Sequence, residues 1–369
     1  MAKAFGIITS SPEHKVAGMQ DYRPIGAFSI LGRYRVIDFP ISNFSNSGII
    51  NLQVYISSKP RSLAAHIGTG RHYNINSKRG KLQLVFPVEE EFNQIYRTNI
   101  AALASNIDYI ERQSQEYVVI APSCMVFKQD FDALLQDHAE SGSDITLLYH
   151  NVDDAKHGYS TCNELKLDGN RVKAIVPNLA DEDNKAIFME TFVMKKALLL
   201  DLIKKAQATS SMYSLANIVN HLAGELDLRA VEHKGFFAPI TSLKSYFFTQ
   251  MRLSKYEIAS ELFTPDWPIY TRTSDSAPTR YFEGAKVVDS MISNGCKIEG
   301  TVEGSTIARG VEVAKGATVK NCVVLAYVKI GEGAYVENQV IDKYATIAPG
   351  RKIVADIEQP GYIKHSDKV

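Results

Sequence analysis

The feature that most constrains the fold is an apolar residue that recurs about every six positions from residue 285 onward, with small residues and glycines between. This period matches neither the 3.6-residue repeat of a helix nor the alternation of a strand. It fits a parallel β-helix, in which three short strands complete one triangular turn and every sixth side chain points inward. A plain antiparallel meander is the alternative. The residues that follow the period are Ile292, Ile298, Ile307, Val313, Val319, Leu325, Ile330, Val336, Ile341, Ile347 and Ile353.

The first two-thirds of the sequence alternate short apolar runs with amphipathic stretches. The alternation predicts buried strands at 5–8, 51–56, 117–120 and 144–149, and helices at 98–114 and 195–204. Such alternation is typical of right-handed βαβ units with a mostly parallel sheet, which binds ligands at the carboxyl ends of its strands. We therefore expect a Rossmann-like α/β domain at 1–250, a helix and proline-containing linker at 251–284, and the β-helix at 285–369.

The charge balance excludes some classes of function. The chain has 41 basic and 41 acidic side chains, whereas a protein that binds nucleic acid or a membrane surface usually carries a basic excess. The sequence contains no apolar run long enough for a membrane helix and no signal-peptide pattern at its start. The four cysteines are scattered singly, without metal-ligand spacing. We expect a cytoplasmic protein with reduced thiols, no nucleic-acid partner and no membrane partner.

One segment of the sequence resembles the signature of a known enzyme family. Residues 32–49 read GRYRVIDFPISNFSNSGI, which resembles the glucose-1-phosphate adenylyltransferase signature YRIIDFxLSNxxNSGI. Residues 106–110, 116–120 and 128–131 look like that family's QNLDII, EYVVIL and KQDY segments. The family also ends in a left-handed β-helix of hexapeptide repeats, so the resemblance covers nearly the whole chain and implies a nucleotidyltransferase domain before it. The alternatives are another sugar nucleotidyltransferase or a hexapeptide acyltransferase. The acyltransferases usually use a histidine within the repeats, and His365 lies beyond them.

The family joins ATP and glucose 1-phosphate into ADP-glucose and pyrophosphate. This chemistry needs a glycine-rich loop for the triphosphate, acidic groups for magnesium, and basic groups for the sugar phosphate. The loop after the first strand should resemble LAGGxGTRL, but residues 8–16 read ITSSPEHKV, without glycine. Pro12 removes a backbone donor there, and Glu13 adds negative charge near the expected triphosphate.

Four further positions depart from the family's pattern. The resemblance puts Cys124 and Pro239 where the family has its two magnesium-binding aspartates, and a thiol is a poor ligand for magnesium. It also puts Asn178 where the sugar-phosphate lysine should be, and Glu190 in place of a glycine. Loss of one electrostatic stabiliser usually lowers a rate about 100- to 1000-fold. We therefore expect no catalytic residues, no metal site and no cofactor in this chain.

The resemblance implies an accessory, regulatory subunit for glycogen synthesis. We expect a heterotetramer with a catalytic subunit that holds the ATP and Mg²⁺, and a phosphorylated small molecule as effector. By position, Arg35 matches the family's regulatory arginine, and Lys343 and Arg309 lie on the repeats where further basic groups are expected. Surface charges or structural ion pairs are the alternative interpretation of these residues. An active nucleotidyltransferase with relocated ligands, and a sensor that binds a sugar nucleotide or sugar phosphate without turnover, are the alternative functions.

Overall fold

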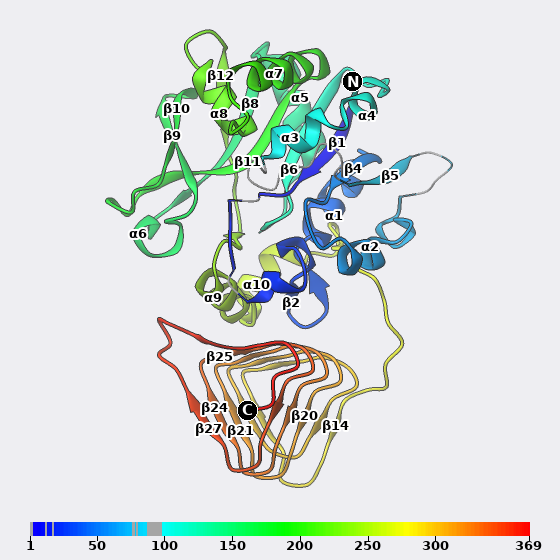
Figure 1. Ribbon diagram of the computed structural model, residues 1–369, viewed down its shortest axis with the longest axis vertical. Helices are drawn as coiled ribbons and strands as arrows, with labels where there is room; N and C mark the ends of the chain where they lie inside the picture. The colour runs from blue at the N-terminus through cyan, green and yellow to red at the C-terminus, as the bar shows by residue number, and fades with distance from the viewer. Residues whose placement is uncertain (1–2, 12, 17, 76–77, 79, 87–97) are drawn as a thin grey trace. The chain divides into compact units, whose positions relative to one another are not determined.

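The computed structural model describes residues 3–11, 13–16, 18–75, 78, 80–86 and 98–369. The chain packs into two compact units (Figure 1). Unit 1 consists of Met1–Lys15, Ile37–Thr241 and Trp267–Tyr270, and unit 2 of Val16–Val36, Ser242–Asp266 and Thr271–Val369. Among the helices described, none is long and apolar enough to cross a membrane.

A mixed β-sheet forms the centre of unit 1. Its strands in the described chain are β1 (Ala4–Thr9), β4 (Asn51–Tyr55), β5 (Lys81–Val85), β6 (Tyr117–Pro122), β8 (Ile145–Val152), β9 (Asn163–Asp168), β10 (Arg171–Pro177), β11 (Lys185–Lys195) and β12 (Leu228–Glu232). They lie in the order β5-β4-β1-β6-β11-β8-β12-β10-β9. From β5 to β6 all neighbours are parallel, as the sequence predicts, and β12 is parallel to β8. Strand β11 runs antiparallel to both β6 and β8, which makes the sheet mixed.

Helices cover both faces of this sheet. They are α1 (Asp38–Asn46), α2 (Arg61–Ile67), α3 (Asn99–Ala104), α4 (Ile107–Glu111), α5 (Phe131–Ser141), α6 (Ala155–Gly158), α7 (Lys196–Thr209) and α8 (Leu215–His221), with the short 3-10 helix η3 (Arg71–Tyr73). Helices α3, α4, α7 and α8 share one apolar cluster with Phe5 and Ile7 of β1. On the other face of β1, a Cβ at Gly6 would lie 2.8 Å from the ring of Phe44 in α1, so glycine permits close packing there.

The helix predicted at 98–114 is two helices, α3 and α4. Thr98 caps α3 by accepting a hydrogen bond from the Ala101 N–H at 3.1 Å. The side-chain amide of Asn106 donates to the Ala102 carbonyl at 3.1 Å and occupies an acceptor near the end of that helix. The apolar spacing runs across this break because both helices pack on the same core.

Unit 2 contains a left-handed parallel β-helix. Its strands are β14 (Arg280–Tyr281), β15 (Lys286–Val288), β16 (Met291–Ile292), β17 (Lys297–Ile298), β18 (Thr301–Glu303), β19 (Thr306–Ile307), β20 (Glu312–Val313), β21 (Thr318–Lys320), β22 (Val323–Val324), β23 (Lys329–Ile330), β24 (Tyr335–Glu337), β25 (Gln339–Ile341), β26 (Thr346–Ile347), β27 (Lys352–Val354) and β28 (Gly361–Ile363). They form three five-stranded sheets in which every pair is parallel. The predicted β-helix is confirmed, and the antiparallel meander is excluded.

The six-residue period places its side chains in the interior of the β-helix. On one sheet Val302, Val319 and Val336 pair in register and belong to the buried core. One position of the predicted series is wrong: Val324, rather than Leu325, pairs with its counterparts on neighbouring coils and packs in that core. In that coil the strand is β22, Val323–Val324, so the inward position falls one residue earlier than the period predicts.

Two segments that precede the β-helix in the sequence also belong to unit 2, Val16–Val36 and Ser242–Asp266. They form β2 (Ser29–Ile30), β3 (Tyr34–Arg35), α9 (Leu243–Leu253) and α10 (Tyr256–Leu262), with the 3-10 helices η1 (Met19–Asp21) and η2 (Ile25–Ala27). The side chain of Gln250 accepts from the Leu31 N–H at 2.9 Å and donates to the Ser29 carbonyl at 2.6 Å. We expect domain boundaries at residues 250 and 284 from the sequence. The two packed units instead combine segments that are far apart in the sequence.

Candidate functional site

The first candidate site lies in unit 1, where β1 and β6 end. Thr9 and Pro122 pair at the carboxyl ends of these parallel strands, which is where an α/β sheet binds ligands. The loop after β1 carries Ser11 and His14, both buried. Pro12, which the sequence assigns to this loop, lies outside the described residues.

The two positions expected to hold magnesium lie side by side. Strand β13 (Phe237–Pro239) pairs with β7 (Met125–Phe127), so that Pro239 lies opposite Met125, next to Cys124. The carbonyl of Cys124 accepts from the Ile240 N–H at 2.8 Å. A thiol and a proline ring offer none of the hard oxygen ligands that Mg²⁺ requires. The magnesium ion that the resemblance implies does not fit these residues.

Glu190 lies at an irregularity of β11. The pairing of β11 with β8 shifts register between Phe188 and Thr191, and Glu190 has a φ of 47°. This left-handed conformation favours glycine, and a non-glycine residue there costs about 1–3 kcal/mol. The glycine expected from the resemblance at this position therefore agrees with the backbone, and the glutamate is held there at an energetic cost.

The Glu190 carboxylate is paired within unit 1. It accepts a hydrogen bond from the Ser11 hydroxyl and lies 3.1 Å from His14 Nε2. Burial favours the neutral form of each partner, but the hydrogen bond and charge between them outweigh it, so the pKa of Glu190 is lowered and that of His14 is raised. The charge of this glutamate is engaged by a histidine that sequence analysis did not select.

Burial, together with the charge of Glu190, raises the pKa of the Cys124 thiol well above its usual value. The thiol lies 3.6 Å from the Ser11 hydroxyl, and the side chain is 1% exposed. It is therefore neutral at pH 7 in the absence of a bound cation. Reactive cysteines usually have lowered pKa values, and the shift at Cys124 is in the opposite direction.

Asn178 has a structural role. Its side-chain amide donates to the carbonyls of Ala155 at 2.9 Å and Tyr159 at 3.0 Å, and its oxygen accepts from the Ala180 N–H. The first two interactions hold the loop after β10 against the segment around α6, and the third lies within the loop itself. The side chain is 3% exposed and supplies no cation for a sugar phosphate.

The second candidate site lies in unit 2 and contains the predicted regulatory residues. Burial and then the charge of Arg35 lower the pKa of Lys343 to about 8, with a smaller contribution from Arg309. The third nearby arginine, Arg23, is neutralised by Asp342 at 2.6 Å in a buried ion pair. Lys343 thus interacts electrostatically with both Arg35 and Arg309, which places the three predicted residues in one positive region.

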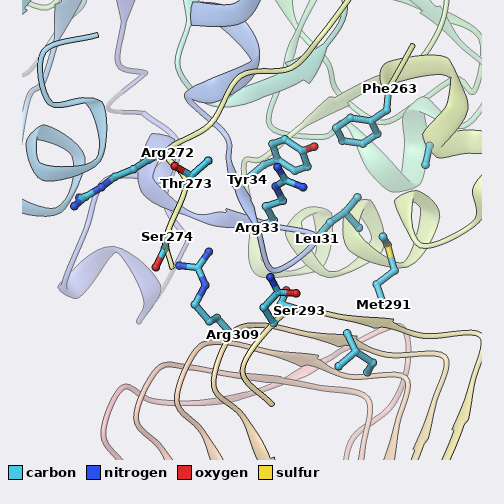
Figure 2. Close-up of a pocket in the computed structure, with 13 residues that line it drawn as sticks. Leu31, Arg33, Tyr34, Phe263, Arg272, Thr273, Ser274, Met291, Ser293 and Arg309 are labelled. Carbon is cyan, nitrogen blue, oxygen red and sulfur yellow. The ribbon is translucent and has the colours of Figure 1, made fainter. Parts of the chain in front are cut away.

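A cavity of about 540 Å³ lies within the same unit. The residues that line it come from the loop at 31–34, α10 and the segment after it, and the β-helix (Figure 2). Arg309 is a lining residue, whereas Arg35 and Lys343 are not. The lining residues are Leu31, Arg33, Tyr34, Ala259, Phe263, Arg272, Thr273, Ser274, Met291, Ile292, Ser293, Asn294 and Arg309.

Sequence analysis did not select two of the arginines that line the cavity. Arg33 lies in the GRYR motif, with its guanidinium 5.5 Å from the ring centre of Tyr34, and Arg272 lies in the linker. Figure 2 shows Arg309 reaching toward Ser274, while Arg272 extends away from it. The place of Arg33 within the GRYR motif was a signal that could have identified it. No local pattern marked Arg272.

Gly32 allows the loop at 31–34 to approach the β-helix. It has a φ of 67°, and a Cβ there would lie 2.3 Å from Ser293 Oγ and 3.0 Å from the Ala308 Cα. Only glycine fits such a position without displacing its neighbours. The close approach brings Arg33 and Ser293 to the same cavity.

Comparison with known proteins agrees with this architecture. Residues 22–234 match the family model of nucleotidyl transferases, and residues 278–362 match a model described as GlmU-like, C-terminal hexapeptide. The chain is 33% identical to the glycogen biosynthesis protein GlgD of Geobacillus stearothermophilus over 300 residues, which are 81% of this chain and 77% of that protein. It is 28% identical to GlgD of Bacillus subtilis (strain 168), over 84% of this chain and 80% of that protein. A glucose-1-phosphate adenylyltransferase of Clostridium perfringens (strain 13 / Type A) is 30% identical, over 80% of this chain and 76% of the enzyme.

Proposed function

Because the chain belongs to the glucose-1-phosphate adenylyltransferase family of nucleotidyl transferases, we propose that it is a non-catalytic regulatory subunit in glycogen biosynthesis. It acts on a catalytic partner that makes ADP-glucose from ATP and glucose 1-phosphate. The observation that carries the proposal is the pairing of β7 with β13, which brings Cys124 and Pro239 together where the family's magnesium carboxylates are expected.

The surroundings of Cys124 support a loss of catalysis. Phosphoryl transfer depends on metal ions and positive groups that stabilise the charge developing on the phosphate oxygens. Here the nearest buried ionised groups are His14 and Glu190, and they are paired with each other. A glutamate in this position adds negative charge where the triphosphate would need a cradle of donors.

The cations of unit 2 support a regulatory role. A phosphorylated effector carries two or more negative charges, and a guanidinium binds phosphate through two parallel hydrogen bonds. Burial, and then repulsion by Arg35, Arg23 and Arg309, lowers the pKa of Lys343 in the free chain. A bound phosphate would relieve this repulsion, so the unit is suited to an anion.

The partnership is tested by reconstitution. The chain is mixed with the glucose-1-phosphate adenylyltransferase of the same cell at micromolar concentration. The expected result is a mixed heterotetramer on size-exclusion chromatography, with a changed maximal rate or a changed response to sugar phosphates. The absence of a mixed oligomer, together with unchanged kinetics, would contradict the proposal.

The sensor is the second candidate function, and the cavity at Arg33 and Arg309 is the observation that favours it. A sensor binds a sugar phosphate or sugar nucleotide without turnover and without altering a catalytic partner. Thermal-shift titration of the purified chain with glucose 1-phosphate and with ADP-glucose measures that binding. Binding in the absence of any effect on the partner's kinetics would favour the sensor.

A further inference from the structure

Three metal-ligand side chains from separate parts of the chain meet at the end of β6 in unit 1. They are His14 from the loop after β1, Cys124 between β6 and β7, and Glu190 from β11. One ligand atom of each lies within 4.8 Å of the other two. We propose that this cluster is a binding site for a divalent transition metal, with Zn²⁺ as the ion that its chemistry fits best.

The identity of the donors selects the metal. Zn²⁺ accepts thiolate sulfur, imidazole nitrogen and carboxylate oxygen in one site, whereas Mg²⁺ requires oxygen throughout. A thiolate from Cys124, a carboxylate from Glu190 and a neutral His14 carry two negative charges together, which balance one Zn²⁺. The site therefore differs in donors and in metal from the magnesium site that the family resemblance implies.

The arrangement is close to that of ligands on a common ion. Zn²⁺ bonds of about 2.0–2.3 Å in a tetrahedron place two ligand atoms about 3.3–3.8 Å apart. His14 Nε2 and the Glu190 carboxylate are already 3.1 Å apart. The Cys124 sulfur lies within 4.8 Å of the other two ligand atoms, and a water molecule would complete a four-coordinate site.

Ser11 provides the surrounding support. Its hydroxyl donates to Glu190, and the Cys124 sulfur lies 3.6 Å from the same oxygen. Such groups next to the ligands orient them and are a regular feature of metal sites. The left-handed backbone at Glu190, with its energetic cost, holds the carboxylate toward this cluster.

Metal binding changes the protonation of the site in a defined way. In the free chain Cys124 is a neutral thiol and His14 shares a proton with Glu190. The metal takes the place of the thiol proton and of the proton between His14 and Glu190, and these protons pass to solvent. The bound ion would then join β6, β11 and the loop after β1.

The test is a titration of the full-length chain, after treatment with a chelator, with Zn²⁺, Co²⁺ and Mg²⁺ in separate experiments. We expect one Zn²⁺ per chain, a higher melting temperature with Zn²⁺, and a thiolate-to-metal charge-transfer band with Co²⁺. Mg²⁺ should cause none of these changes. Cys124→Ser should lose the Co²⁺ band and weaken Zn²⁺ binding at least about 100-fold, because loss of an outer partner alone weakens metal binding about 10- to 100-fold.

Glu190→Gln is the second variant, because it keeps the shape of the side chain if Cys124→Ser fails to fold. It should also weaken Zn²⁺ binding at least about tenfold. The matched control is Cys322→Ser, which alters a buried thiol of the β-helix core in unit 2 and should leave Zn²⁺ binding unchanged. Absence of stoichiometric Zn²⁺ binding by the wild-type chain, or full binding by folded Cys124→Ser, would overturn the proposal. Neither result depends on the regulatory role.

Discussion

The two units differ in how their polar side chains are paired. In unit 1, the polar groups at the ends of β1 and β6 pair with one another. In unit 2, no acidic side chain of the described residues lies within ion-pair distance of Arg33, Arg309 or Lys343. Glu190 meets His14 at 3.1 Å, and Asn178 uses its whole amide on backbone groups. In unit 2, burial and then the positive charges of Arg35 and Arg23 lower the pKa of Lys343 to about 8. The ionised groups of unit 1 therefore neutralise one another, whereas the cations of unit 2 keep a positive charge that the proposed anionic effector would bind.

The largest expected effect is on catalysis and tests the first half of this comparison. The purified chain should make no ADP-glucose above background from ATP, glucose 1-phosphate and Mg²⁺. With at least two electrostatic stabilisers missing, the rate should fall at least about 10⁴-fold below that of a catalytic relative. The double variant Cys124→Asp with Pro239→Asp should also be inactive, because the loop still lacks glycine. Turnover by that double variant would show that the carboxylates alone were missing.

The buried ion pair of unit 2 should give the largest effect on stability. Arg23 and Asp342 lie 2.6 Å apart with side chains 4% and 0% exposed, and the Tyr362 hydroxyl donates to the same carboxylate. Asp342→Asn should lower the free energy of unfolding by about 3–5 kcal/mol, because it leaves the Arg23 charge buried and unpaired. Urea denaturation measures this. An effect below about 1 kcal/mol, the range of exposed pairs, would contradict it.

The ion pair of unit 1 should give a smaller, pH-dependent effect. Glu190→Gln should lower the free energy of unfolding by about 2–3 kcal/mol. The contribution of Glu190 is present above its usual pKa of 4.5 and is lost as the pH falls through its lowered pKa. That of His14 is present below its usual pKa of 6.5 and is lost as the pH rises through its raised pKa. The difference between wild type and variant should therefore be greatest between pH 4.5 and 6.5 in metal-free buffer, and a flat difference would argue against the pair.

Arginine variants in the reconstituted complex test whether the cations of unit 2 bind the effector. Arg35→Ala and Arg309→Ala should each leave assembly intact and raise the half-saturating effector concentration about tenfold or more, because a hydrogen bond to a charged group contributes about 1.5–3 kcal/mol. Arg35→Lys should restore only part of the response, since an ammonium lacks the planar fork of donors. Arg351→Ala, at an exposed arginine of the β-helix, is the control. An unchanged effector curve for Arg35→Ala would show that Arg35 has no regulatory role, and loss of assembly would assign it to structure.

The smallest expected effect is a gain in stability when the buried, repelled charge of Lys343 is removed. Its pKa in the folded chain is about 8, below the usual 10.5, so the unfolded chain binds more protons between these values and stability rises with pH there. Lys343→Met should stabilise the chain at pH 7 by about 1–2 kcal/mol, and the difference should shrink as the pH rises above 8. Thermal denaturation across this range measures it. A variant less stable than wild type at pH 7 would show that Lys343 has a favourable partner.

The β-helix could be predicted from the sequence because its repeat is local. Each coil of a β-helix requires an inward side chain at about every sixth residue, whatever the rest of the chain packs against. The strands β1, β4, β6 and β8 could be predicted for the same reason, since each is one apolar run. The break between α3 and α4 could not, because both segments keep apolar spacing and only the bond from Asn106 to Ala102 marks the interruption.

From the sequence alone we could predict that the family's catalytic groups are replaced, because the resemblance puts Cys124 and Pro239 at motif positions with fixed spacing from their neighbours in the chain. The sequence also identified Arg35, Lys343 and Arg309 as basic residues, but without showing that they share one electrostatic region. Only the tertiary structure brought Glu190 to His14, which lies 176 positions away, and Arg33 to the cavity that contains Arg309. Such meetings depend on strand order and on the path of loops, which join distant segments through packing that no local pattern encodes.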